Sequence, residues 1–338
     1  MSVELKVEQE RLASVVERFS RVRVVVVGDL VADQFLYGEI ARVSREAPVF
    51  ILRHERTETL PGGAANCALN LASLGASVSL IGVVGDDEAG RALLEKLTEA
   101  GVSCESIRTL AGSRTITKVR VLAGQAHSAR QQVIRVDYED GPLMDNALRA
   151  ELRESVRREA AASDAVIISD YNYGVADEEM SEMVREAVRE RRAPVLVDSR
   201  FRLSSFRGFT SATPNEDEVE QLLGRKLSDE REVEEAGALL RERLNLAALL
   251  ITRGGRGMML FEEGLEPLQL DAVGAREPVD GTGAGDTVIA AYALSIASGA
   301  GFADAARLAN HAGGLVVMKR GTASLSSAEL LASISERN

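Results

Sequence analysis

Cysteine and histidine are scarce in this sequence, and their scarcity excludes two kinds of site. The 338 residues include two cysteines and three histidines. Cys67 and Cys104 lack metal-ligand spacing, and the histidines are too scattered to form a zinc pattern. We therefore expect neither a disulfide framework nor a structural zinc site.

Long hydrophobic runs and an excess of basic charge are also missing. No apolar stretch approaches the ~18–20 residues that a membrane-spanning helix needs. Residues 1–10 are charged and lack the apolar core of a signal peptide. Lys plus Arg total 40 against 52 Asp plus Glu, and the net charge of −12 argues against a nucleic-acid-binding surface. We expect a cytoplasmic protein with neither membrane nor nucleic-acid partners.

An alternation of strand-like and helix-like segments dominates what is present. Continuous apolar runs, typical of buried parallel strands, occur at 22–27, 78–84, 165–169, 194–197 and 247–252. Helical stretches occur at 4–20, 63–74, 88–100, 143–161, 177–191, 215–223, 229–243 and 288–297. This order predicts an α/β fold with a doubly wound, mostly parallel sheet and helices on both faces.

Residues 33–58 and 112–137 break this alternation, because they carry no helical period and are predicted to be extended. In the second segment Val119 and Val121 fall on one face of the strand, and Lys118 and Arg120 fall on the other. Such inserts often form a small sheet over a ligand site; ordinary edge hairpins are the alternative. With no repeat or linker, we expect a single domain over residues 1–338 with a small β lid.

The segment from Val279 to Thr287 is the most informative motif. Its glycines lead into an apolar helix, so backbone N–H groups of Gly283, Ala284 and Gly285 can form an anion hole at a helix start. Asp286 is unsuited to binding phosphate but suited to taking a proton from an attacking alcohol. Asp286 also matches neither the Walker A pattern, which ends in Gly-Lys-Ser/Thr, nor the dinucleotide pattern, which has Gly or Ala at this position. The loop predicts phosphoryl transfer; a tight turn that only caps the helix is the alternative.

Two further motifs are candidates for the nucleotide side of such a site. Asn215 and Glu218 lie three apart at a helix start and could position Mg²⁺ through water. Thr252-Arg253-Gly254-Gly255-Arg256-Gly257 follows a predicted buried strand, at the sheet edge where α/β proteins bind ligands. A capped helix and a simple hairpin turn are the respective alternatives.

Candidates for the acceptor side lie nearer the N-terminus. Asp29 and Asp33 follow the first strand, where carboxylates can accept hydrogen bonds from sugar hydroxyls. Gly62, Gly63 and Asn66 begin a helix of small residues, which suggests a ligand-facing edge or, alternatively, close helix packing. The expected lid is basic, with Arg42, Arg45, Arg53 and Arg56 in one insert and Lys118 and Arg120 in the other. These cations could hold a sugar phosphate or could be solvated surface groups.

Taken in order, these motifs give a resemblance that covers nearly the whole chain. The sequence resembles the ribokinase-like (PfkB) carbohydrate kinases through Gly28-Asp29 with Asp33, Pro61 to Asn66, Gly82 to Asp87, Thr213-Pro214-Asn215 with Glu218, and Gly283 to Asp286. Within that family it is most similar to the heptose 7-phosphate kinases of lipopolysaccharide precursor synthesis. The short sequence segments that support this similarity are Tyr37-Gly38, Ser44 to Pro48, Ile134 to Asp137, Ser169-Asp170-Tyr171, Thr252-Arg253, Gly257-Met258, Ala309-Asn310 and Gly321-Thr322.

The resemblance implies an ATP- and Mg²⁺-dependent sugar kinase and leaves dependence on a monovalent cation such as K⁺ open. Asp286 would be the base. Asp29, Asp33, Gly62, Gly63, Asn66, Lys118 and Arg120 would hold the sugar phosphate. Asn215, Glu218, Thr252, Arg253, Gly255, Gly257 and Asn310 would serve the nucleotide, the first two also the metal. A homodimer through the lid is expected from the resemblance alone.

Departures from the subfamily pattern bear on the substrate and leave the phosphotransfer motifs intact. Tyr173, before Gly174, stands where the subfamily has Lys, and Ser199-Arg200 stands where it commonly has Pro-Lys. Gly281 takes a place that the subfamily often fills with Val or Thr. The nucleotidyltransferase half of bifunctional relatives is not expected here. A kinase of another sugar, and a non-catalytic sugar or nucleotide sensor on the same fold, remain the alternatives.

Overall fold

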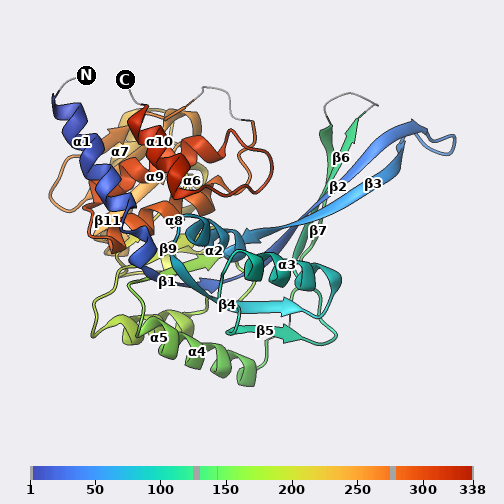
Figure 1. The fold of residues 1–338 in the computed structure, drawn as a ribbon, viewed down its shortest axis with the longest axis horizontal. Coiled ribbons are helices and arrows are strands. Elements are labelled where there is room, and N and C mark those ends of the chain that lie inside the picture. The colour runs from blue at the N-terminus through green and yellow to red at the C-terminus, as the bar shows by residue number, and fades with distance from the viewer. Residues whose placement is uncertain (1–2, 125–129, 143, 275–278, 337–338) are drawn as a thin grey trace.

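A large open sheet with helices on both faces forms the body of the molecule, and a second sheet projects from it (Figure 1). The computed structural model describes residues 3–124, 130–142, 144–274 and 279–336. Residues 125–129 of the expected lid and residue 143 of an expected helix lie outside these ranges.

The central sheet has nine strands in the described residues, in the order β13-β12-β11-β10-β9-β8-β1-β4-β5. Their bounds are β1 Arg23–Gly28, β4 Ser77–Gly85, β5 Ile107–Leu110, β8 Ala165–Asp170, β9 Val195–Ser199, β10 Ser211–Ala212, β11 Ala248–Thr252, β12 Met258–Glu262 and β13 Leu268–Leu270. All neighbours from β5 to β11 pair in parallel, and β12 and β13 add an antiparallel edge. The carboxyl ends of the parallel strands therefore meet at one edge.

Two apolar clusters cover the two faces of this sheet. In β1, Val24 and Val26 join one cluster while Val25 and Val27 join the other, as the alternation of a strand requires. The first cluster is covered by α1 Val3–Val16, α2 Ala64–Ser73, α3 Glu88–Glu99, α8 Ala284–Ala297, α9 Phe302–Val316 and α10 Ser327–Ser335. The second is covered by α4 Asn146–Ala160, α5 Glu178–Val188, α6 Glu216–Leu223 and α7 Glu230–Leu244.

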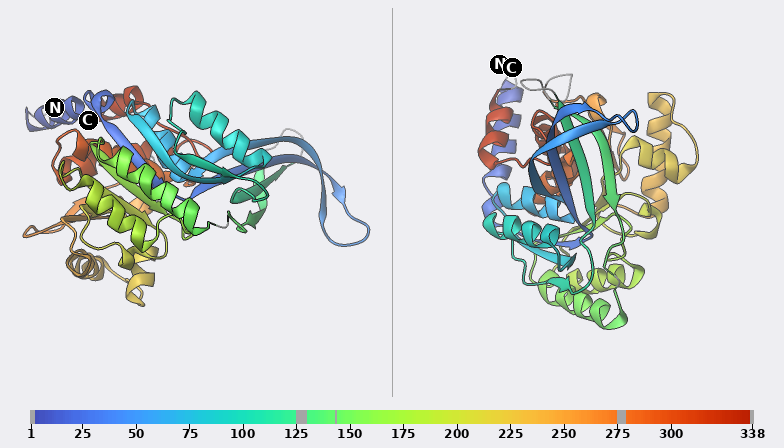
Figure 2. Two further views of the ribbon diagram at one scale, coloured as in Figure 1. Left: turned by 90° about the horizontal axis from the view of Figure 1, so that it is seen from below. Right: turned by 90° about the vertical axis from the view of Figure 1, so that its right-hand side faces the viewer.

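The lid is the second sheet, of strand order β3-β2-β6-β7. Its strands are β2 Leu30–Val43, β3 Phe50–Gly63, β6 Thr117–Gly124 and β7 Gln131–Tyr138. Figure 2 shows that this sheet is curved and that the β2–β3 hairpin extends farthest from the body. Only Asp29 separates β1 from β2, so the chain passes from the central sheet into the lid within one residue.

The predicted fold class is confirmed, and the differences have local causes. The lid strands β2 and β3 begin and end nearer the body than residues 33 and 58, because residues 30–32 already pair with residues 61–63. The helix expected at 4–20 ends at Val16, and a short 3₁₀ turn, Phe19–Arg21, follows it. Helix α8 begins at Ala284, so Asp286 lies inside its first turn. The sequence reading did not predict β5, β10, β12, β13, α9 or α10.

The N-cap of α3 links the body to the lid. Asp87 accepts a hydrogen bond of 2.8 Å from the N–H of Gly90 and caps α3. The same carboxylate accepts from both the N–H and the hydroxyl of Thr115, just before β6. The cap therefore also fixes the entry of the second lid insert. None of the helices in the described ranges combines the length and apolar character that a bilayer crossing demands.

Candidate active site

Asp286 lies where two pockets meet, at the carboxyl edge of the central sheet and beneath the lid. The pocket on the lid side, called here the acceptor pocket, has a volume of about 470 Å³. The pocket toward α6, called here the donor pocket, has a volume of about 230 Å³. Asp286, Tyr171, Arg200, Gly281 and Gly283 line both. A group held in one pocket therefore faces a group held in the other across the Asp286 carboxylate.

The Asp286 carboxylate is buried and held at both oxygens. Only 3% of the residue is exposed. Asn66 Nδ2 donates a hydrogen bond of 2.7 Å to Oδ2, and the Tyr171 hydroxyl donates one of 3.1 Å to Oδ1. Burial raises the pKa of Asp286 to about 7, although these two hydrogen bonds oppose the rise. A carboxylate with this proton affinity can accept a proton near neutral pH.

The loop before α8 is shaped by a positive φ and by one carboxylate. Gly283 has φ 77°, and a Cβ there would lie 2.5 Å from Asn66 Nδ2, so only glycine fits. Asp280 accepts hydrogen bonds of 2.9 Å from the N–H groups of Thr282 and Gly321. Burial raises the pKa of Asp280, but these bonds outweigh it and leave the value below normal. The loop is thus tied to the segment after α9.

The start of α8 offers amide groups to an anion. Gly283 and Gly285 line the donor pocket, and the N–H of Ala284 donates to Gly281 O at 3.3 Å. The N–H groups of Gly285 and Asp286 occupy the second and third helical positions, where a helix supplies no carbonyl partner. Of the three predicted anion-hole residues, Ala284 is thus the one whose amide is already engaged.

Cations dominate the wall of the acceptor pocket. Its lining residues are Val31, Asp33, Gly63, Lys118, Arg120, Arg135, Tyr171, Arg200, Asp280, Gly281, Thr282, Gly283 and Asp286. Four cations thus face three carboxylates, in a chain whose net charge is −12. A pocket of this composition suits an acceptor that carries negative charge.

An ion pair anchors the cations to the lid strands. Arg120 on β6 pairs with Asp33 on β2, and both side chains are largely buried. Burial raises the pKa of Asp33, and the nearby Arg120 and Lys118 limit the rise. Burial and the neighbouring Arg200 lower the pKa of Lys118. Arg120 is thus held in place by its ion pair, and Lys118, which is 9% exposed, lines the pocket beside it.

The donor pocket is lined by oxygen-bearing groups. Its residues are Asp170, Tyr171, Asp198, Arg200, Thr213, Asn215, Glu218, Thr252, Gly281, Gly283, Gly285 and Asp286. Asn215 and Glu218 form a reciprocal capping box at the start of α6. The capped helix that the sequence offered as the alternative is therefore present. The same two side chains nevertheless line the donor pocket. Burial, together with Glu218 and Asp286, raises the pKa of Asp198 well above normal.

The donor pocket suits a hydrated divalent cation. The Thr213 hydroxyl is buried there without a hydrogen-bond partner, and the carboxylates and amide around it are hard oxygen ligands. In the ranges that the structure describes, no three acidic, histidine or cysteine residues converge closely enough to bind a metal directly. Binding through water, as Mg²⁺ prefers, matches both observations. Asn215, Glu218 and Asp198 are the residues that would hold it.

Asp29, Gly62 and Asn66 lie behind the acceptor pocket. Asp29 is 1% exposed, and its carboxylate accepts hydrogen bonds from the N–H groups of Tyr171, Tyr173 and Val175. Gly62 packs so closely on Asp33 that a Cβ would lie 2.5 Å from Oδ2. Asn66 is fully buried and bonds to Asp286. In this geometry the three residues support the pocket from behind, whereas Asp33 and Gly63 line the pocket itself.

Four of the predicted nucleotide residues lie outside the two pockets. Arg253 is buried in ion pairs with Glu216 at 2.8 Å and Glu230 at 3.2 Å. Asn310 Nδ2 donates to Asp271 O at 2.7 Å. Gly255 follows Gly254 in a 3₁₀ turn, and Gly257, with φ 83°, ends it. None of these four is among the residues that line the acceptor or donor pocket as described, whereas Thr252 is.

The lid arginines divide into two groups. Arg56 lines a third cavity of about 740 Å³ under the lid, where its guanidinium stacks on Tyr37 and pairs with Glu58. Arg42, Arg45 and Arg53 line neither the acceptor pocket nor this cavity in the described residues, and Arg53 pairs with Glu39 at 3.5 Å. The alternative considered from the sequence, that the lid arginines are solvated surface groups, therefore fits Arg42, Arg45 and Arg53.

Sequence reasoning gave no site role to Tyr171, Arg135, Arg200 or Asp198, which all line the pockets. A signal existed for three of them. Tyr171, Asp198 and Arg200 directly follow or end the predicted strands at 165–169 and 194–197, where ligands bind in open α/β sheets. Arg135 pairs with Arg120 across β6 and β7 and therefore lies on the same face of the lid sheet. Finding it from the sequence would have required knowing how these two strands pair.

Comparison with known proteins gives a family and several relatives. Residues 22–329 match the model described as pfkB family carbohydrate kinase. The chain is 43% identical over 315 residues to the bifunctional protein HldE of Edwardsiella ictaluri, across 92% of this chain and 63% of that protein. It is 38% identical to HldE of Desulfatibacillum aliphaticivorans, across 95% of this chain and 65% of the relative. The chain thus spans somewhat less than two thirds of these relatives.

Solved structures share the fold at lower identity. Arabidopsis thaliana ribokinase complexed with ribose and ATP aligns with TM-score 0.71 and 22% identity, over 93% of this chain and 98% of that one. Phosphofructokinase-2 from Escherichia coli in complex with substrates and products aligns with TM-score 0.75 and 20% identity, over the same shares. These similarities establish a shared fold.

Proposed function

Because this chain belongs to the pfkB family of carbohydrate kinases, we propose that it transfers the γ-phosphoryl group of ATP to a hydroxyl of a sugar phosphate. The observation that carries the proposal is the position of Asp286, a buried carboxylate with a pKa of about 7 between the acceptor and donor pockets. A general base must face the acceptor hydroxyl on one side and the transferred phosphoryl group on the other.

The proposed reaction assigns a task to each wall of the site. The acceptor hydroxyl attacks the γ-phosphorus in line, and its proton passes to the Asp286 carboxylate. Amides at the start of α8, with Arg200 between the pockets, stabilise charge on the transferred group. Asn66 keeps the base oriented through its bond to Oδ2. Mg²⁺ bound near Asn215, Glu218 and Asp198 would neutralise phosphate charge. A requirement for K⁺ stays a prediction.

We propose D-glycero-β-D-manno-heptose 7-phosphate as the acceptor, converted to the 1,7-bisphosphate. Two observations support this acceptor. Short sequence segments resemble those of the heptose 7-phosphate kinases, and the acceptor pocket is rich in cations. Lys118, Arg120 and Arg135 could bind a phosphate at the end of the sugar distant from the attacked hydroxyl. Asp33 would accept hydrogen bonds from sugar hydroxyls at the same wall.

A substrate panel tests both levels of this proposal. Purified protein is given ATP and Mg²⁺ with sugar 7-, 6- and 1-phosphates and with unphosphorylated sugars, and ADP release is measured. We expect the highest kcat/KM with the heptose 7-phosphate, and phosphorus NMR should place the new ester at carbon 1. Preference for an unphosphorylated sugar would remove the acceptor assignment, and absence of ADP release with every acceptor would remove the kinase.

We further propose that the protein forms a homodimer through the outer face of the lid. This outer face is the side of the lid sheet opposite the acceptor pocket, formed by Leu36, Val119, Val121, Ile134 and Val136. The residues pair across β2, β6 and β7 and make a continuous apolar stripe, of which Ile134 is 56% exposed. An exposed stripe of this kind suits an apolar partner surface, and a second lid offers one. The single-domain organisation and the cytoplasmic location expected from the sequence remain predictions.

A further inference from the structure

The Tyr171 side chain contacts the base directly and yet has no task in the reaction as described so far. Its hydroxyl donates to Asp286 Oδ1 at 3.1 Å, and its ring lines both the acceptor and the donor pocket. The Lys118 ammonium lies 5.4 Å from the centre of the ring. Burial and the neighbouring Asp286 raise the pKa of Tyr171 well above normal, so the hydroxyl stays protonated and remains a donor.

We propose that Tyr171 is a positioning residue for the base, whose hydroxyl holds Oδ1 of Asp286 and favours the ionised carboxylate that accepts the proton. The inference rests on the proposed kinase function. Asn66 donates a hydrogen bond to Oδ2 in the same way. Each carboxylate oxygen therefore accepts from one donor, which comes from α2 for Oδ2 and from the loop after β8 for Oδ1. Two donors aimed at one carboxylate fix its plane and favour its charged form.

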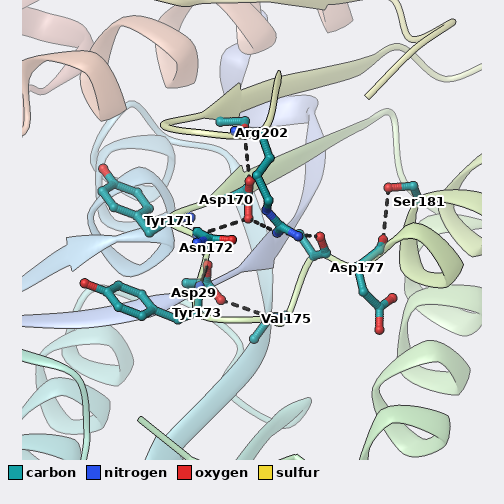
Figure 3. A network of polar contacts seen from close by, with 12 residues as sticks. Asp29, Asp170, Tyr171, Asn172, Tyr173, Val175, Asp177, Ser181 and Arg202 are labelled. Carbon is teal, nitrogen blue, oxygen red and sulfur yellow. Dashed lines mark hydrogen bonds and ion pairs between the residues drawn. The ribbon is translucent and has the colours of Figure 1, made fainter. Parts of the chain in front are cut away.

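The loop that carries Tyr171 is built around the buried carboxylate of Asp29. Asp29 Oδ2 accepts from the N–H groups of Tyr171 at 2.8 Å and Tyr173 at 3.0 Å, and Oδ1 accepts from Val175 at 3.1 Å. Figure 3 shows Asp29 between Tyr171 and Tyr173, whose side chains extend from the loop in the same general direction. Three hydrogen bonds to a single carboxylate define the loop backbone, and hence the starting point of the Tyr171 side chain.

A second buried carboxylate, Asp170, holds the other side of the loop. It accepts hydrogen bonds from the N–H of Asn172 and from the Arg202 guanidinium (Figure 3). It also accepts one from the Ser199 hydroxyl. Asn172 has φ 66°, a left-handed conformation that the surrounding contacts must maintain. The N–H groups of Tyr171 and of Asn172, the next residue, are thus each held by a buried carboxylate.

The charged groups around Asp286 set the sign of the expected effect. Asp33 from β2, which raises the pKa of Asp286, and Lys118 from β6, which lowers it, face the carboxylate. Asp198 from β9, Arg200 after β9 and Asp280 before α8 line the same two pockets. None of these is removed when Tyr171 loses its hydroxyl. The loss of that one donor should raise the pKa of Asp286, because the hydrogen bond stabilises the ionised carboxylate more than the protonated acid.

The test compares Tyr171→Phe with Tyr173→Phe. Both variants delete one hydroxyl from the same loop, but the Tyr173 hydroxyl donates to Glu139 at 2.8 Å and does not contact Asp286. In Tyr171→Phe we expect the acid limb of kcat/KM to move to higher pH by roughly one unit, the size of one hydrogen bond to a charged group. Activity should fall roughly ten-fold below the limb and much less above it. The acid limb of Tyr173→Phe should match that of the wild type.

Acid limbs that coincide in the two variants would overturn the inference while leaving the kinase proposal intact. ATP and the sugar phosphate titrate identically in all three proteins, so a difference between limbs reports on the protein. A carbon NMR titration of the Asp286 carboxyl gives the same comparison without turnover. It therefore separates failure of this inference from failure of the proposed function. A higher Asp286 pKa in Tyr171→Phe alone is the expected result, and equal values would overturn it.

Asp29→Asn provides a second, independent variant. An asparagine can accept through one oxygen only, so at least one of the three N–H groups loses its partner and the loop is released. The acid limb should shift in the same direction as in Tyr171→Phe. Adding Tyr171→Phe to Asp29→Asn should then shift the limb less than it does in the wild type. Full additivity of the two shifts would show that Asp29 does not act through Tyr171.

Discussion

Asn66 Nδ2 donates a 2.7 Å hydrogen bond to Asp286 Oδ2, across 220 residues of sequence. The bond joins α2 to α8, and Asn66 is itself held by Asn70, one turn further along α2. Thr287, next to the base, in turn donates to Asn70 at 2.9 Å. The amides on α2 therefore form the buried support of the base, and the site depends on the packing of these two helices.

Replacement of the base tests the proposed proton transfer. Asp286→Asn should lower kcat by at least ~10², the range expected when a general base is lost. Asparagine keeps the size of the side chain, so ATP binding, measured by equilibrium titration, should be largely retained. Near-normal turnover in Asp286→Asn would remove the base assignment.

The same variant should gain stability at alkaline pH. The folded pKa of Asp286 is about 7, above the unfolded value of about 3.9, so ionisation of the folded protein costs stability as pH rises through this window. Asn carries no such cost. One of the two donors loses its acceptor in the variant, which offsets part of the gain. We expect a net increase in unfolding free energy of about 1–3 kcal/mol at about pH 8 that shrinks toward pH 5.

Denaturant unfolding of wild type and Asp286→Asn at these two pH values is the measurement. A stability difference that is the same at both would contradict the assignment of a raised pKa to Asp286.

The acceptor-pocket cations should govern recognition of the substrate phosphate. Lys118→Met removes a charge from the pocket wall and should raise KM for the sugar phosphate about ten-fold or more, the strength of a charge-assisted hydrogen bond. KM for ATP should change little. Arg53→Met is the matched control, because it removes one positive charge from an exposed lid position. Equal effects of the two substitutions on KM would indicate that only the overall charge of the lid matters.

The outer face of the lid should carry self-association. Ile134→Glu places a charge at the exposed β7 side of the apolar stripe and should shift the protein from dimer to monomer in sedimentation at micromolar concentration. Leu265→Glu adds the same charge at an exposed apolar residue of the body, 64% exposed, and should leave the dimer intact. A wild-type protein that sediments as a monomer under these conditions would refute the lid dimer.

The motifs that were found from the sequence are those whose meaning is local. The glycines before α8 and Asp286 form one contiguous turn, and the strand runs of β1, β4, β8, β9 and β11 are continuous. The faces of β6 followed from simple alternation, which correctly placed Lys118 and Arg120 together. Pattern and periodicity were sufficient for these features, because a short stretch of chain contains all the information.

The remaining features depend on residues that meet only in the folded protein. Arg253 follows a buried strand like a ligand-binding residue, but Glu216 and Glu230 on other elements neutralise it. Asp29 carries a family motif, yet its partners are three N–H groups about 145 positions away. No spacing rule applied to either segment alone reveals such pairings. The roles proposed for the individual site residues remain predictions that the substitutions above can test.

The two-residue period of β6 has a consequence for how this lid can vary. Lys118 and Arg120 face the acceptor pocket, while Val119 and Val121 lie on the opposite side of the same strand. A deletion of one residue within β6 would exchange the two sides, turning the cations outward and the valines toward the sugar. Length changes inside this strand are therefore tolerable only in steps of two, whereas the hairpin ends are free of that restriction. Comparison of lid lengths among related sequences would reveal this parity.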